Sequence, residues 1–84
     1  MTKHSYTWFK TDGSYEQVDL DHNLTLEEMQ ELVGGYIERV QVKYHGKTHY
    51  MWVNEEGLIH DLPLNHEASR IAGRPTVGNT FIVS

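Results

Sequence analysis

TLEEMQELVGG, the stretch from Thr25 to Gly35, decides the fold because it predicts the main helix of the chain. The Thr25 hydroxyl can accept a hydrogen bond from the Glu28 amide while the Glu28 carboxylate reaches back to Thr25, which is a capping box. Four apolar residues recur at the spacing of one helix face, and these are Leu26, Met29, Leu32 and Val33. Gly34 and Gly35 end the helix. About two turns of helix are unstable without tertiary packing, so the segment needs a sheet to cover.

Short segments of strand-forming residues lie on both sides of this helix. Residues 6–9 and 15–20 flank an Asp-Gly turn and predict a hairpin before it. Residues 36–44 and 48–54 predict a second hairpin after it, around His45-Gly46-Lys47. The alternation slips between Ile37 and Val40, which predicts a bulge. Both faces of residues 48–54 are apolar, which predicts a strand inside the sheet.

The remaining residues predict a short extended piece, a second helix and a last strand. Residues 58–62 form the extended piece, and Pro63 limits how far it can pair. Asn65 can cap a short helix that ends before Gly73, and residues 80–83 form the last strand. We therefore expect an α+β fold, with a small, mostly antiparallel sheet of about five strands, one main helix and a short second helix. A β-grasp-like sheet is one option, and the strand order stays open.

Length and composition limit the class of protein. Eighty-four residues allow a single domain over 1–84, in which hydrophobic burial and ordering entropy nearly balance, so a homo-oligomer would add useful stability. The chain has no cysteine, no apolar leader and no membrane-length segment, which predicts a protein of the cytoplasm with no membrane partner. The net charge is −5 and the basic residues are scattered, which argues against direct nucleic-acid binding.

No stretch of the sequence carries a catalytic or metal-binding signature. The serines lack a nucleophile elbow, and no phosphate-binding glycine loop occurs. Six histidines leave a metal-dependent hydrolase as a minor alternative, through His45, His49, His60 and His66. Isolated surface histidines explain the same pattern, and we favour that interpretation. We expect no catalytic residue, no bound metal and no cofactor.

Aromatic and charged residues suggest a binding surface. Trp8 and Tyr36 are candidates to stack on a ligand, with Arg39 or Lys43 placed to meet a phosphate. Glu38 follows the two glycines that allow a ligand to approach the backbone closely. Whether Tyr50 and Trp52 belong to the core or to a site stays open.

Four ordered motifs resemble a domain-of-unknown-function family carried by phages and mobile elements. They are Gly34-Gly35-Tyr36-Ile37-Glu38, the segment from Met51 to Gly57, Leu62-Pro63-Leu64-Asn65, and Val77-Gly78-Asn79. The resemblance covers residues 26–83 and implies a small accessory protein in the cytoplasm of a host bacterium. It adds Asn54 to the candidate binding residues and implies no reaction.

We therefore expect a non-enzymatic phage accessory protein, acting in host takeover or against host defence. It would bind and inhibit or sequester a host protein or a small nucleotide signal as a homo-oligomer. A regulatory subunit of a phage replication or transcription complex is the alternative, because a partner surface leaves no motif.

Overall fold

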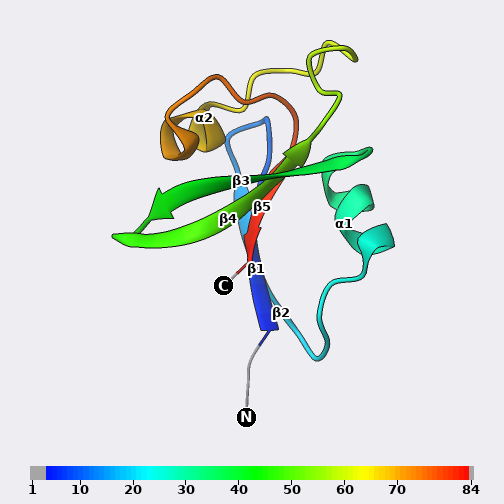
Figure 1. Ribbon diagram of the computed structural model, residues 1–84, viewed down its shortest axis with the longest axis vertical. Coiled ribbons are helices and arrows are strands. Elements are labelled where there is room, and N and C mark those ends of the chain that lie inside the picture. Colours follow the sequence, from blue (N-terminus) through cyan, green and yellow to red (C-terminus); the bar gives the residue numbers. More distant parts are fainter. Residues whose placement is uncertain (1–3, 84) are drawn as a thin grey trace.

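The computed structural model describes residues 4–83, which form one five-stranded sheet with helices on both of its faces (Figure 1). The elements are β1 (His4–Phe9), β2 (Tyr15–Leu20), α1 (Leu26–Val33), β3 (Ile37–Tyr44), β4 (Lys47–Asn54), α2 (His66–Ala72) and β5 (Thr80–Val83). The predicted α+β class, with a main helix and a shorter second one, is confirmed.

The strand order is β2-β1-β5-β4-β3, and every neighbouring pair is antiparallel. β5 lies between the two hairpins and joins them into one sheet. β5 starts at Thr80, which pairs with Phe9, the last residue of β1. β4 ends at the same end of the sheet, so β5 runs antiparallel to both strands. The sheet therefore differs from a β-grasp, in which the first and last strands are parallel neighbours.

The β3–β4 hairpin has an unbroken register from Ile37 opposite Asn54 to Tyr44 opposite Lys47. The predicted bulge is therefore wrong. Arg39 explains the slip in the apolar pattern. Its side chain lies on the same face of the sheet as that of Ile37, but α1 does not cover this position, so a charged residue is tolerated there. β4 has neighbours on both sides, so its predicted interior position is confirmed.

α1 begins and ends as its sequence predicts. The Glu28 amide donates to the Thr25 hydroxyl across 3.2 Å, and the Thr25 amide donates to the Glu28 carboxylate across 2.9 Å. Gly34 has φ +79°, a left-handed conformation that suits glycine, and ends the helix. The apolar side of α1 packs on a core built around Tyr6, Val33 and Phe81.

α2 covers the opposite face of the sheet and begins at the predicted cap. The Asn65 side chain accepts a hydrogen bond from the Ala68 amide across 3.1 Å. Ala68 packs into a second core, whose other fully or nearly buried members are Phe9, Val42, Met51, Val53 and Ile82. The sheet thus separates two apolar cores, one under each helix.

Residues 55–61 form a compact series of turns and not the extended piece that was predicted over 58–62. The His60 amide donates to the Glu56 carbonyl across 3.0 Å, and Asp61 takes φ +54° where the chain reverses. Leu58 and Ile59 look strand-forming in the sequence but have no strand to pair with. Between this segment and β5, Leu64 and Val77 form one isolated antiparallel bridge.

Candidate functional site

A hollow of about 580 Å³ lies on the α2 face, between the β1–β2 hairpin, the far end of β3 and α2. We call it the aromatic cleft, and its main lining side chains are Phe9, Tyr15, Lys43, Tyr44, Glu67 and Arg70. β2 and β3 are the two outermost strands, yet both contribute to it. The sheet must therefore curl strongly around α2, which agrees with the marked twist of small antiparallel sheets (Figure 1).

Three rings meet in the aromatic cleft. The Phe9 ring centroid lies 6.4 Å from that of Tyr15 and 6.0 Å from that of Tyr44. Phe9 is almost fully buried and packs against both tyrosines, whereas Tyr15 stays 68% exposed. Exposed aromatic rings around a hollow offer flat surfaces on which a planar ligand can stack.

Two cationic side chains border the same cleft. The Arg70 guanidinium pairs with the Glu67 carboxylate one helical turn away, and this contact raises the pKa of Arg70. Lys43 approaches from the end of β3. Because Arg70 is exposed, a phosphate could take over one or more of its five donors. The cleft thus combines stacking surfaces with permanent positive charge.

His45 closes one corner of the cleft, in the turn between β3 and β4. Its ring stacks on Tyr44 with centroids 4.0 Å apart, while His49 meets the same ring edge-on at 6.0 Å. Within residues 4–83, no three side chains of the types that ligate metals come together. The structure therefore places these two histidines around an aromatic ring.

Three of the six candidate binding residues line hollows. Lys43 lines the aromatic cleft. Glu38 and Asn54 line a second hollow of about 390 Å³ with Arg74. Asn54 is buried, and both ends of its amide are engaged, because it donates to the Val33 carbonyl across 3.1 Å and accepts from the Glu56 amide across 2.8 Å.

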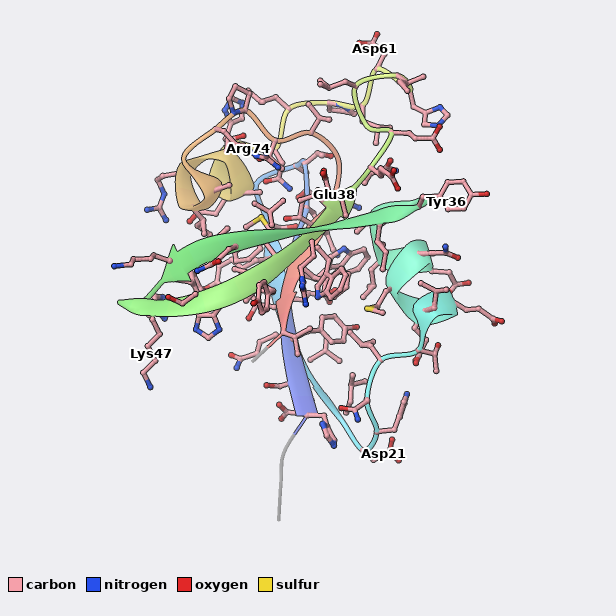
Figure 2. All side chains as sticks on the ribbon, in the orientation of Figure 1. Asp21, Tyr36, Glu38, Lys47, Asp61 and Arg74 are labelled. Atoms are coloured by element: carbon pink, nitrogen blue, oxygen red, sulfur yellow. The ribbon has the colours of Figure 1, made fainter. Side chains whose placement is uncertain are left out.

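The other three candidates lie apart from these hollows and from one another. Trp8 packs in the core under α1, and its indole nitrogen donates to the Leu32 carbonyl across 3.0 Å. Tyr36 is 64% exposed and points away from the sheet (Figure 2). Arg39 lies over the Tyr50 ring, with its guanidinium carbon 4.3 Å from the ring centroid. The six residues therefore do not form one site.

The aromatic residues of the cleft were missed in the sequence. Tyr15 and Tyr44 come from strands at opposite edges of the sheet, and Phe9 joins them only because β1 lies beside β5. The available signal was an aromatic residue at the turn end of three of the four hairpin strands, namely Phe9, Tyr15 and Tyr44. That signal points to a shared site only when the strand order is known.

A separate charged cluster surrounds His22, at the entry to α1. Its ring nitrogens lie 2.7 Å from the Asp21 carboxylate and 3.1 Å from the Glu28 carboxylate. Hydrogen bonds to Asp21 and then Glu28 raise the pKa of His22. This cluster is exposed and supports the start of the helix.

Fold and cleft together define a small α+β domain with an open, aromatic, cation-bordered hollow of ligand size. The chain belongs to the family described as "Domain of unknown function (DUF3846)", whose model matches residues 9–84, from the last residue of β1 onward. No curated protein and no solved structure matches the chain. Within residues 4–83, no helix has the length and apolar character needed to cross a membrane.

Proposed function

We propose that this protein is a non-enzymatic binding module that sequesters a small anionic ligand with a planar ring. A nucleotide signal is the leading case. The observation that supports this proposal is the convergence of three aromatic rings and two cations on one hollow of about 580 Å³. That volume lies inside the range of typical small-molecule sites.

The ligand would use the two parts of the cleft differently. Its base would stack against Tyr15, the most exposed of the three rings, with Tyr44 on the far side. Its phosphate would meet Arg70 and Lys43 at the rim, where the guanidinium can make two parallel hydrogen bonds. When the phosphate binds Arg70, the Glu67 carboxylate loses its partner. Ligands that offer Glu67 a new hydrogen-bond donor would therefore be favoured.

Sequestration fits the cellular setting that the sequence motifs suggest. A phage accessory protein made abundantly in the host cytoplasm can lower the free concentration of a signal by binding alone. Sequestration requires tight binding and many copies of the protein, and it requires no chemical step. The proposal therefore assigns the lining residues to recognition.

The test is a calorimetric titration of the purified protein with a panel of linear and cyclic nucleotides. We expect saturable binding by at least one of them. Tyr15→Ala removes a stacking surface and Arg70→Ala removes a charged donor, so each should weaken binding about tenfold. Raising the salt concentration should weaken the wild-type protein more than Arg70→Ala.

Tyr36→Ala is the matched control, because Tyr36 is as exposed as Tyr15 but lies outside the cleft. It should bind like the wild type. Absence of saturable binding across the panel, or an equal loss in Tyr36→Ala, would contradict the proposal. A defined phage replication or transcription protein that binds in place of nucleotides would favour the regulatory-subunit alternative.

A further inference from the structure

Residues 55–61, which we call the apolar loop, present two large aliphatic side chains to solvent. Leu58 is 82% exposed and Ile59 is 77% exposed. Single exposed aliphatic residues are ordinary on protein surfaces, but an adjacent pair on a projecting loop makes one continuous apolar surface that a partner can cover. Figure 1 shows this loop projecting from one end of the molecule.

The apolar loop has a defined shape before any partner arrives. The Glu56 amide donates to the Asn54 side chain across 2.8 Å, and the Leu62 amide donates to the Gly57 carbonyl across 3.1 Å. Gly57 also lies so close to Val77 that a Cβ there would come within 2.7 Å of it. A loop ordered in this way loses little conformational entropy when it binds.

An apolar groove of about 400 Å³ lies on the α1 face, between residues 23–29 and β4. Its main lining side chains are Leu24, Met29, Thr48, Tyr50, Trp52 and Val83. Tyr50 is 46% exposed and Val83 is 40% exposed, so neither helix covers this part of the sheet. The groove has room for two aliphatic side chains.

Loop and groove carry opposite charges at their margins. The apolar loop has carboxylates on both sides of its aliphatic pair, at Glu55, Glu56 and Asp61. On the β-strand wall of the groove, Arg39 lies against Tyr50. Glu28 on the opposite wall is already engaged by His22 and by the Thr25 amide. Opposite charge around apolar contacts favours one orientation of association.

The loop and the groove lie apart on a molecule about 40 Å long. Figure 2 places Asp61 of the apolar loop at one end, and Lys47 and Asp21, which adjoin the groove segments in sequence, toward the other. A chain cannot place its own loop in its own groove. We propose that the apolar loop of one copy docks in the apolar groove of a second copy, head to tail. Such a contact is heterologous, so repetition closes a ring or extends a chain of subunits.

The test measures solution mass by light scattering over a concentration series. The wild type should form assemblies heavier than one chain. Two variants should be monomers, namely Leu58→Ser with Ile59→Ser, which removes the anchor, and Tyr50→Asp, which charges the groove. Leu64→Ser is the matched control, because Leu64 is 42% exposed and belongs to neither the apolar loop nor the apolar groove, and it should assemble like the wild type. Circular dichroism establishes that each variant is folded.

Mixing the two monomeric variants distinguishes this contact from a symmetric one. The loop variant keeps an intact groove and the groove variant keeps an intact loop, so together they should form a one-to-one dimer. A monomeric wild type, assembly that survives both changes, or a mixture that stays monomeric would overturn the proposal. Leu58, Ile59 and Tyr50 all lie outside the aromatic cleft, so nucleotide binding can succeed or fail independently of assembly.

Discussion

The side-chain amide of Asn54 donates to the backbone carbonyl of Val33 across 3.1 Å, and this bond fastens the last turn of α1 to the end of β4. The same side chain accepts from the Glu56 amide and so also shapes the apolar loop. Gly35 passes directly beside it, because a Cβ at that position would lie 2.9 Å from the amide nitrogen. One buried amide thus joins a helix, a strand and a loop.

Asn54→Ala should lower the free energy of unfolding by about 2–3 kcal/mol, because the Val33 carbonyl and the Glu56 amide both lose their partner. Urea denaturation followed by circular dichroism measures this change. Asn23→Ala is the control, since Asn23 is exposed and should tolerate the substitution within about 0.5 kcal/mol. Equal stability of Asn54→Ala and the wild type would contradict the prediction.

Gly35→Ala should cost about 1–3 kcal/mol, because the added methyl group overlaps the Asn54 amide. In the Asn54→Ala background the overlap disappears, so the same substitution should cost much less there. A double-mutant cycle measures the difference, and we expect a coupling energy of at least about 0.5 kcal/mol. Purely additive effects would show that the close approach has no energetic consequence.

Asn65→Ala should be among the most damaging single changes, at about 3 kcal/mol or more. Asn65 is fully buried, caps α2 through Ala68, and donates to the Phe9 carbonyl across 3.1 Å and the Gly78 carbonyl across 2.9 Å. Asn65→Asp keeps the cap but loses both donors, so its free energy of unfolding should show no recovery to the wild-type value. Thermal denaturation of the two variants tests whether both are less stable than the wild type.

Thr80→Val should leave stability unchanged or raise it by up to about 1 kcal/mol. Thr80 is fully buried, and within residues 4–83 its hydroxyl has no hydrogen-bond partner. Valine has the same shape without the unpaired group and favours strands. Chemical denaturation compares it with the wild type, and a loss of more than about 1 kcal/mol would reveal a hydrogen bond at that hydroxyl.

Stability should depend on pH through His22. Its pKa is raised, chiefly by Asp21 and then by Glu28, so its contribution is complete below the unfolded pKa of about 6.5 and is lost as the pH rises through the folded pKa. The pKa of Asp21 is lowered by the hydrogen bond to His22, so that carboxylate loses its contribution as the pH falls through its folded pKa.

The difference in stability between wild type and His22→Gln should therefore be largest in mildly acidic solution. It should shrink toward alkaline pH and again in strong acid. Unfolding curves across this range test the prediction, and high salt should flatten the profile because the cluster is exposed. A difference that does not vary with pH would contradict it.

Local sequence chemistry was sufficient to predict most elements of this fold. The capping box at Thr25, the cap at Asn65 and the turns around Gly13 and Gly46 act within a few residues, and each is present. The extended piece over 58–62 was wrong because its apolar residues had no neighbour to pair with. Strand order also escaped prediction, because it depends on where the long segment 55–79 returns the chain.

The same limit applies to the candidate site. Lys43 was predicted and lies in the aromatic cleft, whereas the residues around it come from both outer strands and from α2. Trp8 looked like a free aromatic surface in the sequence, but the neighbouring helix covers it. Exposure and convergence are tertiary properties, so spacing along the chain does not reveal them.

The position of β5 has a consequence for how the protein forms during synthesis. Each hairpin can pair locally once it leaves the ribosome, but β1 and β4 join one sheet only when residues 80–83 arrive, and these also bring Phe81 to the core under α1. Until then each hairpin exposes a bare edge that can recruit a foreign strand. The interval between the second hairpin and β5 is therefore when the nascent chain has most need of a chaperone.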